Sequence, residues 1–390
     1  MGDNIYGDNR RPSRIWGPER TVGPWKNVDR FLPSSEEELK RRYELARNKP
    51  GYTELRRRAK VIGTWDDHDY GLNDAGKEFT GKNMTQKLLM DFLDEPEDAP
   101  RRKQAGVYAS YVLGPNGKQI KVILLDTRYH RDPLLSYGTI LGDAQWEWLE
   151  KELKGPQTEL TIIVSSVQVI SNISATGNPL VFIECWGHFP KERERLFKLI
   201  DDSKRSGVIF TSGDVHFGEI ARYDCGVQYP LYDITSSGLT RSLEEEGGPL
   251  MTYLIRAVFW LVPSTMRVFS PSCRHKSCIY AKPNFGAIEI NWDASPPRVK
   301  IELRDEDGNS VNEVSFLLSE LQANGVAGSR EPASGYQQHC THETDLPWLL
   351  RKRLALILWA VVGVVLGIIF LLLREILSAT KRLFQKNKID

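Results

Sequence analysis

The sequence lacks an excess of charge of either sign. Its 52 lysines and arginines stand against 51 aspartates and glutamates, for a formal net charge of +1, and the basic residues are spread along the chain. A nucleic-acid-binding protein usually carries a concentrated basic surface that neutralises phosphates. The composition therefore shows no nucleic-acid footprint, and no internal repeat is present.

Cysteine is also scarce. The five cysteines are an odd number, and no two of them form a CxxC pair. This pattern indicates neither a zinc ribbon nor a disulfide scaffold. Cys273 and Cys278 lie close enough in sequence to form a disulfide or to remain as two free thiols, and both alternatives stay open.

One long hydrophobic run is present near the C-terminus. From Leu354 to Leu373 the chain carries no charged residue, and about twenty apolar residues suffice to cross a bilayer as a helix. Basic residues border the run on both sides: Arg351, Lys352, Arg353, Arg374, Lys381 and Arg382. These sharp borders favour a membrane span over a buried core helix. We expect a transmembrane helix at 351–375 and a short basic tail at 376–390.

The charges around this run also indicate an orientation. The tail is slightly more basic, with Lys386 and Lys388 added, which favours a cytoplasmic C-terminus and an extracytoplasmic or lumenal main domain. Two matches to the glycosylation acceptor pattern, at 83–85 and 172–174, are consistent with that side. No signal peptide is recognisable at the N-terminus.

The hydrophobic pattern of the main part predicts alternating strands and helices, and hence an α/β fold. Ser35 followed by Glu38 is a capping pattern that begins the first helix. Further helices are expected at 52–59, 84–93, 143–153 and 192–203. Strands are expected at 61–65, 106–113, 119–126, 160–167, 208–211, 231–235, 285–292 and 298–303, the last three as an antiparallel edge.

Composition also divides the chain. We expect one domain over 1–320 and a linker over 321–350, where Gly, Ala, Ser, Gln and Pro accumulate. The segment 250–269 is apolar but interrupted by Arg256 and Pro263. It either packs against the domain, the alternative we favour, or touches the membrane surface as an amphipathic stretch.

Three short acidic motifs dominate the functional interpretation. They are Gly2-Asp3-Asn4-Ile5-Tyr6-Gly7-Asp8, Thr64-Trp65-Asp66-Asp67-His68-Asp69-Tyr70-Gly71 and Ser212-Gly213-Asp214-Val215-His216-Phe217-Gly218-Glu219. The last two follow apolar runs that are typical of buried strands, and ligands at successive strand ends can build a shared metal site. The four titratable residues 66–69 would repel one another if buried without cations. A metal-dependent hydrolase is therefore the leading hypothesis.

The residue types suggest individual roles. The Asp3 carboxylate could bridge two cations, and the Tyr6 phenol suits a hard trivalent iron, although an acidic N-terminal loop without metal is an equal alternative. Asp67 would bind metal, and His68 would stabilise the phosphate or protonate the leaving oxygen.

The third motif adds a further pair of ligands. Asp214 and His216 stand two residues apart, so in an extended backbone both side chains face one site.

Together with Leu125-Asp126-Thr127-Arg128, the motifs resemble the PhoD-like alkaline phosphatases and phosphodiesterases, within the calcineurin-like metallophosphoesterases, over about residues 1–300. The resemblance implies a β-sandwich flanked by helices and a centre of Fe³⁺ and Ca²⁺, or another divalent metal. It also implies that Asp3 bridges the metals. It assigns metal ligation to Asp3, Tyr6, Asp67, Asp214 and His216, and catalysis to His68 and Arg128. Arg128 would contact phosphate or form a structural ion pair.

The resulting prediction is a membrane-anchored phosphatase or phosphodiesterase in which metal-activated hydroxide attacks the phosphorus of a phosphate ester. Members of the family carry an earlier strand and a Ser-Cys element that supplies another iron ligand, and neither precedes Asp3 here. We therefore expect the natural start to lie upstream. The alternative is a membrane-tethered binding domain, derived from a metallophosphatase, that has lost catalysis. The sequence leaves the substrate open.

Overall fold

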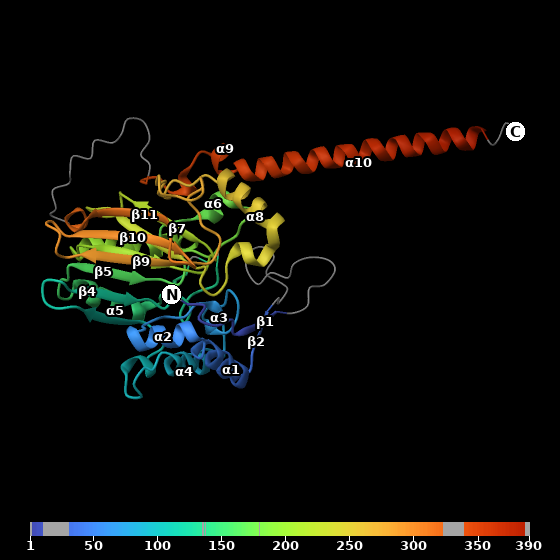
Figure 1. The fold of residues 1–390 in the computed structure, drawn as a ribbon. Coiled ribbons are helices and arrows are strands. Elements are labelled where there is room, and N and C mark those ends of the chain that lie inside the picture. Colours follow the sequence, from blue (N-terminus) through green and yellow to red (C-terminus); the bar gives the residue numbers. More distant parts are fainter. Residues whose placement is uncertain are drawn as a thin grey trace.

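The computed structural model describes residues 2–10, 31–134, 136, 138–178, 180–322 and 339–386. The predicted α/β class is confirmed, because two β-sheets pack together with helices around them (Figure 1). One long helix at the C-terminus projects away from this body.

The larger sheet has six strands in the order β3-β4-β5-β6-β8-β7. Strands β4, β5, β6 and β8 are parallel, whereas β3 and β7 run antiparallel to their neighbours. The strands are β3 (Ala109–Leu113), β4 (Ile120–Leu124), β5 (Leu160–Val164), β6 (Val208–Ser212), β7 (Gly218–Tyr223) and β8 (Leu231–Ser236). Most residues of the parallel strands are apolar and buried, as expected for strands covered on both faces, although β8 also buries Asp233 and Thr235.

Helices cover one face of this sheet and a second sheet covers the other. On one face lie α5 (Asp143–Lys154) and α7 (Pro190–Asp202), with the Phe197 ring 6.3 Å from that of Phe210. On the other face Tyr232 stacks on Phe316 at 4.7 Å. Phe316 belongs to a three-stranded antiparallel sheet of β9 (Asn284–Asn291), β10 (Arg298–Asp305) and β11 (Ser310–Leu317). The sequence pattern missed β7 and β11.

The N-terminal part adds a smaller core of its own around Trp65 and Tyr70. Ser35 caps its first helix as predicted, since the Ser35 hydroxyl accepts a bond from the Glu38 amide at 3.2 Å. This part contains the short ribbon β1 (Asp8–Arg10) and β2 (Phe31–Pro33), and the helices α1 (Glu36–Arg47), α2 (Pro50–Arg58), α3 (Asp67–Tyr70) and α4 (Lys82–Phe92).

The strand predicted at 61–65 is wrong. This segment makes no strand ladder and is held instead by side chains. The Thr64 hydroxyl donates to the Leu125 carbonyl at 2.9 Å, and the Arg101 guanidinium donates to the Gly63 carbonyl at 2.5 Å. An apolar run indicates that a segment is buried but not that it is a strand. Here the buried backbone carbonyls accept hydrogen bonds from side chains instead of from a neighbouring strand.

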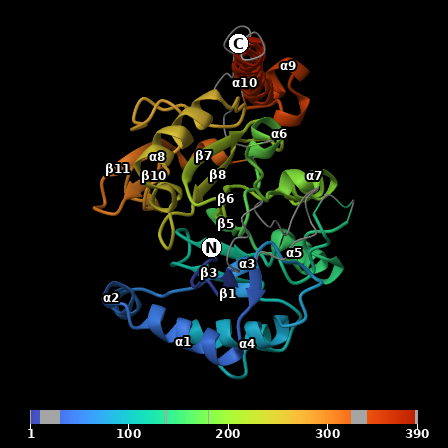
Figure 2. The ribbon, with the colours of Figure 1, turned by 90° about the vertical axis from the view of Figure 1, so that its right-hand side faces the viewer.

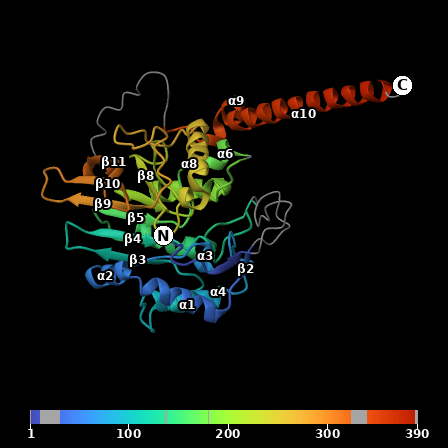
Figure 3. The same ribbon diagram turned by 45° about the vertical axis from the view of Figure 1, so that its right-hand side comes forward.

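The C-terminal part joins the long helix to the domain. After α6 (Ile173–Gly177) and α8 (Leu243–Leu261), the short helix α9 (Trp348–Arg351) leads into α10 (Arg353–Lys386). Its stretch Arg353–Ala379 is long and apolar enough to cross a membrane, and its apolar window is not buried inside the protein. Figure 3 shows α10 leaving the body beside α8 and α6.

The segment 250–269 forms part of α8 and the turn after it. Phe259 and Val262 are buried, which supports the packing alternative for one face. Tyr253, Leu254 and Trp260 remain exposed on another.

Two disulfides are present, although the sequence did not indicate a disulfide scaffold. Cys273 pairs with Cys278, which resolves the alternative left open above. Cys225, just after β7, pairs with Cys340, which stands 115 residues further along the chain. Only the folded arrangement brings this second pair together. Cys185 is a buried free thiol.

Candidate active site

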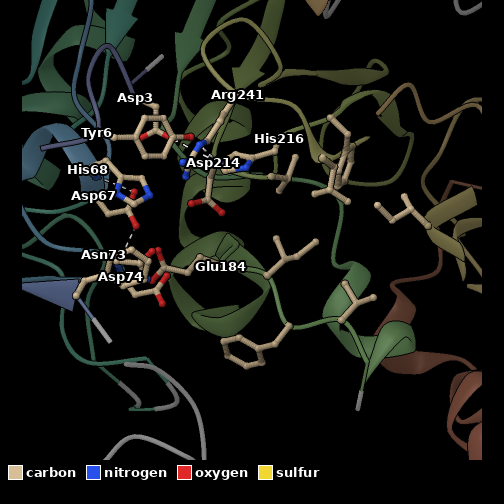
Figure 4. Close-up of a pocket in the computed structure, with 18 of the residues that line it drawn as sticks. Asp3, Tyr6, Asp67, His68, Asn73, Asp74, Glu184, Asp214, His216 and Arg241 are labelled. Atoms are coloured by element: carbon tan, nitrogen blue, oxygen red, sulfur yellow. Dashed lines mark hydrogen bonds and ion pairs between the residues drawn. The ribbon is translucent and has the colours of Figure 1, made fainter. Parts of the chain in front are cut away.

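The three acidic motifs converge at one cavity of about 900 Å³. The second motif forms α3, and the third follows the carboxyl end of β6. Figure 4 shows the polar side chains gathered in one part of this cavity. Six of the seven residues predicted from sequence line it: Asp3, Tyr6, Asp67, His68, Asp214 and His216. Arg128 is not among the lining residues.

The first motif lies directly against the second. An Asp69 carboxylate oxygen accepts a bond from the Ile5 amide at 3.0 Å, and the Gly7 amide donates to the His68 carbonyl at 3.1 Å. A Cβ atom on Gly7 would lie 2.5 Å from that carbonyl oxygen, so a residue without a side chain is required. The glycine thereby allows the N-terminal segment to deliver Asp3 and Tyr6 to the cavity.

Asp3, Tyr6 and His216 form the first group of possible ligands. The Tyr6 hydroxyl lies 2.8 Å from His216 Nε2 and 3.3 Å from Asp3 Oδ2. His216 Nε2 lies 3.8 Å from the same Asp3 oxygen. The other oxygen, Asp3 Oδ1, is buried and has no hydrogen-bond partner among the described residues. A phenol, an imidazole and a carboxylate thus point at one position.

A second group is made of carboxylates. Oxygens of Asp66, Asp67 and Asp214 lie within 4.8 Å of one another, and ligand atoms of Asp3, Asp67 and His68 meet the same limit. The Asp67 carboxylate therefore belongs to both of these clusters, and the second one links it to Asp3 of the first group. Oxygen-rich clusters of this kind are the ligand sets that hard cations prefer.

The electrostatics of these carboxylates call for positive charge. Burial raises the pKa of Asp214, and the neighbouring Asp66 and Asp67 raise it further. Burial likewise raises the pKa of Asp66, and the Arg128 guanidinium lowers it only in part. Although burial of Asp67 would raise its pKa too, His68 and Arg128 bring it to about 2. Multivalent cations at this position would stabilise the charged forms, so the residues present fit a metal centre.

His68 is held in a fixed orientation by Asp8. His68 Nδ1 lies 2.7 Å from Asp8 Oδ1, and the other Asp8 oxygen accepts a bond from the Asn73 amide at 2.9 Å. Burial lowers the pKa of His68, but Asp67, Asp3 and Asp8 raise it to about 10. With Nδ1 engaged, Nε2 is the nitrogen left for proton transfer. Sequence spacing gave no sign of this pair, because the fold alone brings Asp8 to His68.

Arg128 forms a buried ion pair, one of the two alternatives weighed from the sequence. Its side chain is fully buried, and its Nε and Nη2 atoms lie 2.7 and 2.5 Å from Asp66 Oδ1. It also pairs with Glu184 and lies 3.5 Å from Asp214. Two other arginines, Arg42 and Arg241, do line the cavity, and the Arg241 guanidinium lies 4.4 Å from the centre of the Tyr6 ring. Neither Arg241 nor Glu184 stands in a motif, so no sequence signal marked them.

The backbone at the third motif differs from the prediction. Asp214 and His216 have φ angles of +74° and +57°, so the chain is not extended there. Both side chains reach the site from a left-handed turn after β6, and Asp3 also has a positive φ, of +51°. Such conformations are unfavourable for residues other than glycine and are concentrated at functional sites.

Comparison with known proteins places the chain among phosphatases. A family model described as PhoD-like phosphatase matches residues 1–244. Alkaline phosphatase D of Bacillus subtilis is 21% identical over 255 residues, which are 55% of this chain and 40% of that protein. The solved structure titled "Structure of PhoD" matches with a TM-score of 0.55 and 15% identity, covering 83% of this chain and 64% of that one. The chain thus spans less than two thirds of either relative, and the structural match concerns the fold.

Proposed function

The chain belongs to the PhoD-like phosphatase family, and from this premise we propose that it hydrolyses phosphate esters with the help of bound cations, as a membrane-anchored enzyme. One observation carries the proposal. Carboxylates from separate parts of the chain surround an oriented histidine in one cavity. Their mutual repulsion at this burial is relieved by cations, and cations with a histidine are what phosphoryl transfer requires.

The proposed ligands fall into two sets. Tyr6 and His216 would hold Fe³⁺, because phenolate is a good ligand for a hard trivalent ion. Asp3 lies between these two residues and the remaining carboxylates and would take part in both sets. Asp67 and Asp214 would hold Ca²⁺ or another divalent cation. The bound cations would activate water for attack on phosphorus and offset charge on the phosphoryl oxygens.

The remaining chemistry falls to the side chains of this chain. His68, oriented by Asp8, would donate a proton from Nε2 to the leaving oxygen as the ester bond breaks. Arg241 would contact the phosphate at the cavity wall. We assign Arg128 a positioning role, since its fully buried guanidinium holds the Asp66 carboxylate and lies close to Asp214.

We further propose that the main domain lies on the extracytoplasmic or lumenal side, with α10 in the membrane. Basic residues border the apolar stretch, and disulfides are typical of oxidising compartments. The two disulfides, Cys225–Cys340 and Cys273–Cys278, both lie in the main domain or in the segment before α9.

The direct test of the proposed function is hydrolysis of 4-nitrophenyl phosphate, and of bis(4-nitrophenyl) phosphate as a diester, by the purified full chain. Because 4-nitrophenolate departs readily as the anion, the role of His68 is tested with phenyl phosphate, whose leaving oxygen is more basic. With that ester we expect kcat to fall about 10²- to 10⁴-fold in His68→Ala, the range for loss of a general acid. The matched control is His130→Ala, a histidine outside the cavity lining, which should leave the rate unchanged.

Two outcomes would contradict the proposal. An unchanged rate of phenyl phosphate hydrolysis in His68→Ala would remove this histidine from the mechanism. No hydrolysis of any of these esters by the metal-loaded wild-type chain would favour the tethered binding domain instead.

A further inference from the structure

The cavity at the candidate site has a second, apolar part that the phosphoryl chemistry does not use. It is lined by residues 180–183, which follow α6, and by one side of α8. On α8 the lining side chains are Leu254, Ile255, Val258 and Phe259. Leu180 and Leu254 stay 46% and 55% exposed, so apolar surface remains open within reach of the polar part.

This apolar wall is continuous with the start of the long helix. Leu354, in the first turn of α10, is buried in an apolar cluster that lies next to the third motif. The same cluster contains Ile173, Val215, Phe217, Phe259 and Val262. Val215 and Phe217 alternate with Asp214 and His216, so the cluster that holds Leu354 also reaches the candidate metal ligands of the third motif.

Exposed apolar and aromatic side chains lie near the base of α10, beside the basic residues 351–353. Trp348 and Leu349 of α9 are 57% and 68% exposed, and Tyr253 and Trp260 of α8 are 70% and 64% exposed. In Figure 2, where α10 points toward the viewer, α8, α6 and α3 all lie on the face that α10 leaves. Tryptophan and tyrosine are the residues that accumulate where a protein meets the headgroup layer. With α10 inserted, this face would rest on the bilayer.

We propose, on the basis of the phosphate-ester hydrolysis argued above, that the substrate is a phosphate carried on an apolar, lipid-like alcohol presented by the bilayer. The phosphate enters the polar part of the cavity, and the chain of the alcohol lies along residues 180–183 and α8. Water adds its oxygen to phosphorus as the bond between phosphorus and the alcohol oxygen breaks. The alcohol takes up a proton and returns to the membrane, and the phosphate leaves into water.

The test compares the hydrolysis of phosphate esters that differ only in the length of their alkyl chain. Full chain in detergent is assayed with butyl and decyl phosphate below their micelle-forming concentrations, and with the matching alkyl 4-nitrophenyl diesters, because the site leaves the ester number open. We expect kcat/KM to be at least tenfold higher for decyl than for butyl, since buried methylenes add binding energy.

A substitution on α8 tests where the alkyl chain of the substrate binds. Leu254→Asp should remove most of the tenfold preference for decyl over butyl phosphate in kcat/KM, because it places a charge where the alkyl chain would lie. The matched control is Leu55→Asp on α2, a leucine that is 51% exposed and outside the cavity lining. It should keep the preference.

A last arm separates a bilayer lipid from a soluble amphiphile. The full chain in vesicles should hydrolyse dioleoyl phosphatidate placed in the same vesicles at least tenfold faster than in separate ones. Turnover of 4-nitrophenyl phosphate with no effect of chain length, or with equal rates for both vesicle arrangements, would overturn the lipid inference and leave the proposed function standing. Absence of turnover for all of these esters, soluble ones included, would overturn the proposed function itself.

Discussion

At the scale of single residues, some side chains of the site could be predicted from the sequence and others could not. Asp67, His68, Asp214 and His216 stand in compact motifs, and their types alone indicated a metal centre. Arg241 lines the cavity but stands outside the three motifs, so no sequence pattern marked it. A motif shows only which residues are adjacent along the chain. The contact of Asp8 with His68 and the position of the Arg241 guanidinium depend on the tertiary fold.

A buried acid outside the site, Glu343, gives a prediction about stability and pH. Burial raises its pKa to about 7, and neither of its side-chain oxygens has a hydrogen-bond partner among the described residues. The stability that its neutral form contributes is complete below pH 4.5 and is lost as pH rises through about 7. Glu343→Gln, which stays neutral, should therefore be more stable than wild type at pH 9, by up to about 3 kcal/mol.

The measurement is denaturant unfolding of the full chain in detergent at pH 5 and pH 9. The gain of Glu343→Gln should be small at pH 5 and largest at pH 9. Glu37→Gln, on the exposed surface of α1, is the control and should show no such trend. A gain that is equal at both pH values would argue against a buried charge at this position.

At the scale of elements, the sequence predicted type better than pairing. Helices α5 and α7 and strands β3 to β6 lie close to their predicted ranges, because each has a clear period and turn residues at its ends. Strand β7 was missed, since it follows a motif whose residues drew the interpretation toward a loop. The left-handed turn at Asp214 and His216 was also missed, because non-glycine residues rarely adopt it.

The disulfide between the end of β7 and the segment before α9 makes the orientation testable. In membranes from producing cells, acid-quenched and alkylated under denaturing conditions without reductant, only Cys185 should react, because the other four cysteines are paired. After reduction all five should react, and Cys185→Ser should show no reactive thiol before reduction. Five reactive thiols without reductant would place the main domain in a reducing compartment.

At the scale of the whole molecule, packing connects the family fold to the long apolar helix α10. The resemblance predicted the sandwich and the polar site, and composition predicted the long helix. Neither indicated that α8 would join them, because the contact of Leu354 with the apolar cluster beside the third motif is a property of packing. The exposed apolar residues of α8 form only a short stretch of sequence, which alone predicts no function. Their position next to α10 is what suggests a contact with lipid.

We infer that bound cations hold the acidic side chains at this cavity together. The most direct measurement is the metal content of the intact, folded full chain, purified without chelators and analysed by mass spectrometry of the elements. We predict about two multivalent cations per chain, as in two-metal phosphoryl-transfer sites, and a clear loss in Asp214→Asn. A folded chain without stoichiometric metal of any kind would show that these carboxylates stay together without cations.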